Sequence, residues 1–351
     1  MNSFAVIMAG GVGSRFWPVS TSDNPKQFHD MLGAGSTLIQ KTYQRLSRFI
    51  PESNIFVLTN DRYTSLVLEQ IPGLTREQII PEPAMRNTAP CILLAALKIS
   101  KIDPNATLLV APSDHWIEDE AIFEANIKQC FEFSLAHDSL LTLGIKPTFP
   151  NTGYGYIEFD STVYNGLHKV QQFREKPTYE VAKQFLEQGN FLWNAGIFVW
   201  SIQSLLNGFK QYQPAMFDLF HNGIEVYNTD EEQQFVEANY PLAENISIDY
   251  ALLEKANNVY VLPAEFDWND LGTWGSLHEK LDKDSSSNSV VNAKVHLENT
   301  SDCIISTSPG KKVIVHGISD YIIVDKDDVL LIFPKSMEQD IKRITQLAAD
   351  L

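Results

Sequence analysis

A glycine-rich stretch with two basic residues near the N-terminus has the composition of a phosphate-binding loop. The apolar run from Phe4 to Met8 is short enough to form a buried parallel strand. Three glycines follow it: Gly10, Gly11 and Gly13. Glycine tolerates positive φ and lets backbone N–H groups approach an anion closely. Arg15 and Lys26 add two cations, so this stretch is suited to binding a triphosphate.

The spacing differs from the best-known phosphate loops. A Walker loop ends in Gly-Lys-Ser/Thr, which does not follow Gly10 here. The dinucleotide fingerprint needs a third glycine where this chain has Phe16. An ordinary glycine turn after a strand is the structural alternative, and Arg15, Pro25 and Lys26 argue against it.

Two aspartates follow apolar segments and are candidate ligands for a metal. Asp114 lies two residues after the apolar run 107–112, where a carboxylate at a strand end is well placed to hold Mg²⁺. A helix cap is the alternative for this residue. Asp270 lies in 267–274, between two tryptophans and beside a glycine, which indicates a packed turn. Sequence alone does not show that the two aspartates meet.

The segment from Glu82 to Pro90 is more polar than a connection requires. Glu82 and Asn87 have the donors and acceptors to read a base edge, and Thr88 can cap a helix over 88–102. A capped helix start with a solvated Arg86 is the alternative.

Further polar residues are candidates for contact with a sugar phosphate. Gly155 lets the backbone lie against a ring, Glu175 can accept hydrogen bonds from hydroxyls, and Lys176 can neutralise a phosphate. Asn194 offers a donor and an acceptor to a pair of hydroxyls. A hairpin and a surface ion pair are the plain alternatives for the first three, and Asp249 is equally suited to a first helical turn.

Composition limits the classes of function. The chain has 351 residues and a formal net charge of −17, which argues against general nucleic-acid binding. A polyphosphate site must therefore rely on local cations and a divalent metal. No apolar run approaches the length of a membrane span, and no signal peptide is expected. Its three cysteines lack metal-ligand spacing, so a reducing cytoplasm is expected.

Strands and helices alternate through most of the chain, which favours a Rossmann-like α/β domain over residues 1–281. Its sheet is expected to be mixed and mostly parallel, with Trp193 to Phe198 as a turn into a strand. The Ser-rich break at 282–289 predicts a boundary. A small β-rich domain, expected as a short left-handed β-helix, then occupies 282–351. Its strands are predicted at 303–307, 312–316, 320–324 and 328–333, before a helix from 336 to about 349.

The motifs GGVGSRFWP and PKQF resemble the nucleoside-diphosphate-sugar pyrophosphorylase family, most closely its mannose-1-phosphate guanylyltransferases. Matches such as EPAMRNTAP, PSDH, FREKP, WNAGIF and DWNDLGTW cover nearly the whole chain. The resemblance implies a GT-A-like nucleotidyltransferase fold, with Asp114 and Asp270 as metal ligands. It implies nucleotide contact by Glu82, Arg86, Asn87 and Thr88. It also implies sugar-phosphate contact by Gly155, Glu175, Lys176, Asn194 and Asp249.

The activity implied by this resemblance is transfer of GMP from GTP to α-D-mannose 1-phosphate, giving GDP-mannose and pyrophosphate. Arg15 and Lys26 would be the catalytic cations, Mg²⁺ the cofactor and a homodimer the assembly. Long family members continue into an isomerase domain; this chain ends earlier, so no isomerase activity is expected.

Other classes stay open at this point. A uridylyl- or thymidylyltransferase would use the same loop and metal. A metal-dependent glycosyltransferase would use a strand-end aspartate without the loop. A dehydrogenase would need the third loop glycine, and a non-catalytic nucleotide sensor would be expected to have lost Arg15, Lys26 or the aspartates.

Overall fold

The structure is a computed structural model that describes residues 2–348, and these residues divide into two compact units. The first unit contains the chain up to Gly10, Tyr43–Pro112 and Ile117–Trp268. The second contains Gly11–Thr42, Ser113–Trp116 and the chain from Asn269 onward. This division differs from the sequence boundary at residue 282, because N-terminal segments share a core with the C-terminal region.

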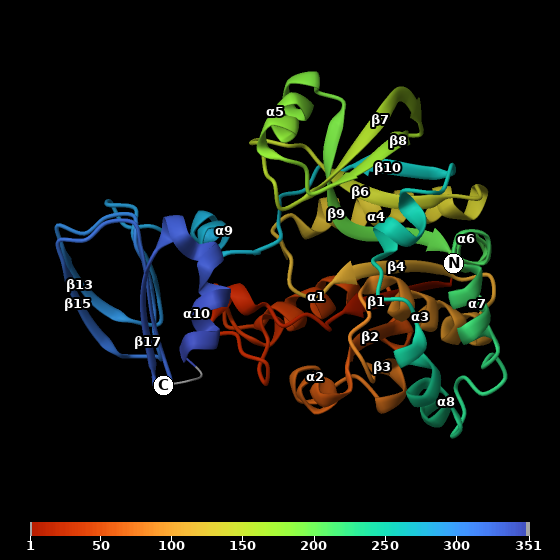
Figure 1. Cartoon of the computed structure of the whole chain (residues 1–351), viewed down its shortest axis with the longest axis horizontal. Coiled ribbons are helices and arrows are strands. Elements are labelled where there is room, and N and C mark those ends of the chain that lie inside the picture. Colours follow the sequence, from red (N-terminus) through yellow and green to blue (C-terminus); the bar gives the residue numbers. More distant parts are fainter. Residues whose placement is uncertain (1, 349–351) are drawn as a thin grey trace. The chain divides into compact units, whose positions relative to one another are not determined.

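The first unit is built on a sheet with the strand order β3-β2-β1-β4-β9-β6-β10-β8-β7 (Figure 1). The strands are β1 (Ser3–Met8), β2 (Ile55–Asn60), β3 (Ile79–Glu82), β4 (Thr107–Pro112), β6 (Leu140–Ile145), β7 (Gly155–Tyr164), β8 (Leu167–Glu175), β9 (Phe191–Ser201) and β10 (Val259–Pro263). Strands β3, β2, β1 and β4 are parallel, whereas β9 is antiparallel to both β4 and β6. The prediction of a mixed sheet is confirmed, but the sheet is not mostly parallel. Its antiparallel pairs, β4–β9, β6–β9, β7–β8, β7–β9 and β8–β10, outnumber the parallel pairs β1–β2, β1–β4, β2–β3 and β6–β10.

Helices cover the sheet and pack against its strands to form the hydrophobic core. They are α1 (Leu38–Ser47), α2 (Thr64–Gln70), α3 (Thr88–Ile102), α4 (Glu120–Ala136), α5 (Tyr179–Gln188), α6 (Ile202–Tyr212), α7 (Pro214–His221) and α8 (Glu232–Asn239). Helix α3 is buried from Ala89 to Ile99 and packs with α6 and α7 on the side chains of Phe4, Val6, Leu108 and Val110. An apolar helix of this kind has to lie inside the protein, because no face of it is suited to water.

One local prediction in the first unit is wrong, and another is confirmed with an unusual helix type. Trp193 to Phe198 is not a turn, because the segment lies inside β9 and pairs with β4, β6 and β7. The segment at Asp249 forms a π-helix, Asp249–Leu253, after the 3₁₀ turn Tyr240–Leu242. Single π turns are rare and often occur at functional sites.

The second unit ends in short strands, most of which stack in parallel, whereas β17 pairs antiparallel with β16. They are β12 (Ser289–Val291), β13 (Lys294–Glu298), β14 (Ile304–Ser306), β15 (Lys312–His316), β16 (Tyr321–Lys326) and β17 (Val329–Pro334). Ile304 pairs with Ile322 and Lys294 with Lys312 at the same residue offset, as in successive coils of a β-helix. A 3₁₀ segment, Lys335–Asp340, and helix α10 (Ile341–Ala348) follow; residue 349 of the predicted helix lies outside the described residues.

One hydrophobic core joins the distant parts of the second unit. Phe16 and Met31 from the N-terminal loop pack with Trp274, and the cluster continues to Ile322 and Ile341. The Phe16 and Trp274 rings have centroids 5.2 Å apart. The glycine loop is therefore anchored on the C-terminal region by apolar burial, which is not directional and leaves no local sequence signal. Among the helices between residues 2 and 348, none combines the length and apolar character needed to cross a bilayer.

Candidate active site

The glycine loop offers backbone donors that the protein itself does not use. It follows β1, whose neighbour β4 runs parallel and leads into Ser113 and Asp114. The amides of residues 10–13 have no hydrogen-bond partner among residues 2–348. Gly13 has φ 65°, and a β-carbon there would lie 2.6 Å from Lys26 Cβ. Only glycine fits that position, so the sequence prediction of a specialised loop has a steric basis.

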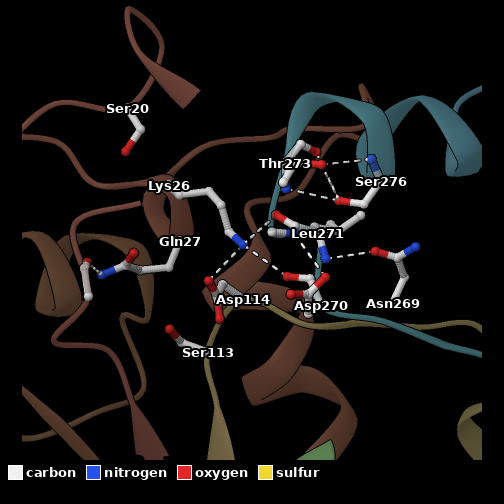
Figure 2. A network of polar contacts seen from close by, with 12 residues as sticks. Ser20, Lys26, Gln27, Ser113, Asp114, Asn269, Asp270, Leu271, Thr273 and Ser276 are labelled. Atoms are coloured by element: carbon white, nitrogen blue, oxygen red, sulfur yellow. Dashed lines mark hydrogen bonds and ion pairs between the residues drawn. The ribbon is translucent and has the colours of Figure 1, made fainter. Parts of the chain in front are cut away.

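Lys26 is buried and connects three segments of the second unit (Figure 2). Its side chain is 4% exposed. The ammonium Nζ lies 2.7 Å from Asp114 Oδ2 and donates to the carbonyl oxygens of Asp270 at 3.1 Å and Leu271 at 2.8 Å. An ammonium has three N–H donors, and these three acceptors can use all of them. The structure thus gives Lys26 a connecting role that the sequence did not predict.

Asp114 and Asp270, which are far apart in sequence, meet at this lysine. Burial raises the pKa of the Asp114 carboxyl, but the Lys26 charge, His115 and hydrogen bonds outweigh it and hold the pKa below its usual value. Asp114 is therefore ionised at neutral pH. Asp270 is shaped by its own turn, in which the Gly272 amide donates to Oδ1 at 3.0 Å.

The two carboxylates fit a hard divalent ion. Within residues 2–348, no group of three or more His, Cys, Asp and Glu side chains is arranged to hold a metal. A pair of carboxylates is nevertheless the protein set that Mg²⁺ uses when phosphate oxygens and waters complete its octahedron. The donor chemistry fits a metal that binds together with a phosphorylated substrate.

Arg15 lies at the surface of the 3₁₀ turn Ser14–Phe16. Its Nε donates to Gln339 Oε1 at 3.1 Å, so the C-terminal 3₁₀ segment contacts the loop residue directly. Arg15 and Lys26 belong to the same compact unit but differ in environment, since one is exposed and the other is buried.

Glu82 is a buried carboxylate at the end of β3. A β-carbon on Gly10 would lie 3.0 Å from Glu82 Oε1, so the carboxylate sits directly beside the first loop glycine. Tyr240 donates its hydroxyl to Glu82 Oε2 at 2.5 Å. Burial raises the pKa of Glu82 to about 7, against the opposing hydrogen bonds from Tyr240 and Cys91.

The other predicted nucleotide residues contact the segment 240–248. Arg86 donates to the Pro241 carbonyl at 2.6 and 3.1 Å, so it is not simply solvated. Asn87 has φ 59° and donates to Asn245 Oδ1 at 2.7 Å. The prediction that Thr88 caps α3 is wrong, because Asn87 occupies the N-cap position and Thr88 is the first helical residue; its hydroxyl accepts the Ile248 amide at 2.9 Å. Positive φ on a non-glycine residue costs energy and is concentrated at functional sites.

The predicted sugar residues gather within the first unit. Asn194 Nδ2 donates to Asp249 Oδ1 at 2.9 Å. A β-carbon on Gly155 would lie 2.6 Å from Glu175 Oε2, so that carboxylate covers the glycine. Burial, followed by the nearby Glu175 charge, raises the pKa of Asp249 to about 6. Lys176, at φ 46°, pairs with Glu175 and exposes most of its side chain.

Three contributing residues were missed by the sequence analysis. Thr142 donates to Asn194 Oδ1 at 2.9 Å, Gln27 donates to the Gly11 carbonyl at 3.0 Å, and Tyr240 contacts Glu82. Gln27 could have been identified from the sequence, because it lies inside the motif PKQF that supplied Lys26. No sequence pattern pointed to Thr142 or Tyr240, because each is distant from its partner in the chain and is brought to it by the fold.

A pocket of about 440 Å³ lies elsewhere in the first unit and contains none of the predicted site residues. It is lined by Arg76, Leu94, Lys98, Asn228 and Glu232, among others. The residues that carry the chemistry above therefore lie outside this pocket.

Comparisons of this chain with known proteins all point to the same family. Residues 4–287 match the profile of the family described as nucleotidyl transferase. A mannose-1-phosphate guanylyltransferase from Salmonella montevideo is 36% identical over 350 residues, covering 97% of this chain and 73% of that protein. One from Escherichia coli is 34% identical over 353 residues, covering 97% and 74%. A crystal structure described as a mannose-1-phosphate geranyltransferase from Thermus thermophilus covers 99% of this chain and 100% of that one, with TM-score 0.90 and 27% identity.

Proposed function

The chain belongs to the nucleotidyl transferase family, and within it to the mannose-1-phosphate guanylyltransferases, and we propose that it transfers GMP from GTP to α-D-mannose 1-phosphate. The products are GDP-mannose and pyrophosphate. The observation that carries the mechanism is the contact of Lys26 with both Asp114 and the Asp270 segment, next to loop amides without partners.

The chemistry requires positioning and charge neutralisation more than proton transfer. An oxygen of the sugar phosphate attacks the α-phosphorus in line, and pyrophosphate leaves with the bonding electron pair. The attacking phosphate is already anionic, so no strong general base is needed. Loop amides and Arg15 are suited to bind the triphosphate, and negative charge that develops in the transition state is stabilised by fixed donors.

The family generally uses a divalent metal ion, and we assign Mg²⁺ here. Asp114 and Asp270 would hold it, and when bound it supplies positive charge to the phosphates. Lys26 keeps Asp114 ionised and fixes the Asp270 turn through two carbonyls, which orients both carboxylates.

Substrate recognition is divided between two groups of residues in this proposal. Glu82, Arg86, Asn87 and Thr88 form the nucleotide side, where Glu82 offers an acceptor to the N–H groups of guanine. Asn194, Asp249, Glu175, Lys176 and Gly155 form the sugar-phosphate side. Buried polar groups of this kind penalise a ligand that leaves them unpaired.

A substrate panel tests the proposed function. We expect GTP to be preferred over ATP, CTP and UTP, and mannose 1-phosphate over glucose 1-phosphate, each by at least about tenfold in kcat/KM. Pyrophosphate release, measured over all pairs of triphosphate and sugar 1-phosphate, gives these ratios directly. Equal or better turnover of UTP or dTTP with glucose 1-phosphate would contradict the guanylyltransferase assignment and leave the nucleotidyl transferase family intact.

The raised pKa of Asp249 predicts a pH effect on the sugar side. As pH falls through about 6, the Asp249 carboxylate gains a proton, so it loses its negative charge and one of its oxygens becomes a hydrogen-bond donor. We expect KM for mannose 1-phosphate to rise more steeply below pH 6 in the wild type than in Asp249→Asn. The substrate's own ionisation affects both proteins equally, so the difference between them isolates Asp249. Parallel pH profiles for the two proteins would remove Asp249 from sugar binding.

Three broader features remain proposals. Residues 1–281 would carry the transfer chemistry, with 282–351 supporting the loop through the shared core. A homodimer is supported by exposed apolar side chains on the C-terminal strands, namely Ile314, Leu330 and Ile332, and light scattering would test it. A cytoplasmic location is supported by three free, buried thiols at Cys91, Cys130 and Cys303.

A further inference from the structure

The segment 240–248 contacts the nucleotide segment 82–89 at several successive positions. At its start the Tyr240 hydroxyl donates to Glu82, and the Pro241 carbonyl accepts from Arg86. Asn245 accepts from Asn87. At its end the Ile246 carbonyl accepts the Ala89 amide at 3.1 Å, and the Ile248 amide donates to Thr88. Each side chain of the nucleotide side is therefore held by a residue of this second segment.

Tyr240 is the most deeply buried contact in this series. The residue is 0% exposed, and its ring stacks on that of Phe220 with centroids 5.7 Å apart. A ring fixed in this way can place its hydroxyl in only one position. The Glu82 carboxylate therefore has a fixed orientation, with one oxygen on Tyr240 and the other beside Gly10.

We propose that Tyr240 is a positioning residue for nucleotide recognition, which acts by holding the Glu82 carboxylate ionised and oriented at the first glycine of the loop. This inference rests on the proposed function, because it gives Glu82 the task of accepting hydrogen bonds from the base. Tyr240 itself touches no substrate in this proposal. It differs from a structural tyrosine in that its hydroxyl controls the charge of a ligand-binding group.

The groups around Glu82 predict the direction in which loss of the Tyr240 hydroxyl shifts the pKa of Glu82. The titratable groups that face Glu82 are the Tyr240 hydroxyl and the Cys91 thiol, and Arg86 acts on Tyr240. Burial raises the pKa of Glu82 and the Tyr240 hydrogen bond lowers it. Removal of the hydroxyl raises the pKa of Glu82 further, so more of the carboxyl is protonated at neutral pH.

The matched control is Tyr227, the other deeply buried tyrosine of this region. It is 1% exposed, and its hydroxyl donates to the Phe220 carbonyl at 2.7 Å rather than to a site residue. Tyr227→Phe and Tyr240→Phe therefore remove the same atom from similar surroundings. Only Tyr240→Phe removes a hydroxyl that donates to a carboxylate beside the glycine loop.

The experiment measures the dissociation constant of GTP with Mg²⁺, without sugar phosphate, between pH 5.5 and about 8.5, a range that brackets the Glu82 transition. In the wild type we expect binding to weaken as pH falls through about 7. In Tyr240→Phe we expect about tenfold weaker binding at neutral pH, with the transition moved to higher pH. Tyr227→Phe should bind GTP with the same pH dependence as the wild type. When Tyr240→Phe is added to Glu82→Gln, the dissociation constant of GTP should not change at any pH.

A Tyr240→Phe profile that coincides with that of Tyr227→Phe would overturn the proposal, as would an additive loss in the Glu82→Gln background. Failure of the proposed function looks different, because the wild type would then prefer another triphosphate in the panel. In that case the same five proteins are compared with the preferred triphosphate, since the contact between hydroxyl and carboxylate does not depend on the base.

Discussion

Lys26→Ala is expected to remove activity and also to destabilise the protein by about 3–5 kcal/mol, because it breaks a buried ion pair and leaves Asp114 without its counter-charge. Two backbone carbonyls lose their donor as well. We expect kcat to fall by at least about a hundredfold, since the carboxylates for the metal lose their orientation. Urea unfolding and steady-state kinetics measure the two effects separately.

Two variants separate stability from chemistry in this prediction. Lys98 is 4% exposed and pairs with Glu232 away from the site, so Lys98→Ala should destabilise the protein while the folded enzyme keeps its kcat. Arg15 is exposed, so Arg15→Ala should lower kcat by about a hundredfold with little change in unfolding free energy. If Lys26→Ala unfolds at the same urea concentration as the wild type, the connecting role of Lys26 is wrong.

Removal of divalent metal is expected to abolish turnover. EDTA should stop pyrophosphate release, and added Mg²⁺ should restore it, because the charge of the phosphates has few protein cations to balance it. Asp114→Asn and Asp270→Asn should each require at least about tenfold more Mg²⁺ for half-maximal rate. Titration of activity against free Mg²⁺ measures this shift.

Asp23→Asn provides the control for the metal prediction. Asp23 is an exposed aspartate of the same compact unit, near Lys26 in sequence, and its contact with Ser22 is local. Its Mg²⁺ requirement should equal that of the wild type. The two-aspartate site would be refuted by an Asp270→Asn enzyme that responds to Mg²⁺ as Asp23→Asn does.

Many of the strands and helices were predictable from the sequence, because their signals are local, but β12 and β13 were not predicted. The apolar run 107–112 became β4 and the periodic segment 88–102 became α3, with the same bounds. The C-terminal strands also lie close to their predicted positions, since turn residues mark their ends. Trp193 to Phe198 was misread, because polar Asn194 and Gly196 resemble a turn until three strands pair around them.

The residue types needed for the chemistry could be read from the sequence: a glycine-rich loop, two cations and two aspartates that follow apolar segments. Their arrangement is a property of the folded chain. Long-range packing buries Lys26 between Asp114 and the Asp270 turn, and it places Tyr240 on Glu82. These contacts join residues far apart in the chain, so no local pattern encodes them. They arise because apolar cores bring the segments together, and the buried polar groups then have to find partners.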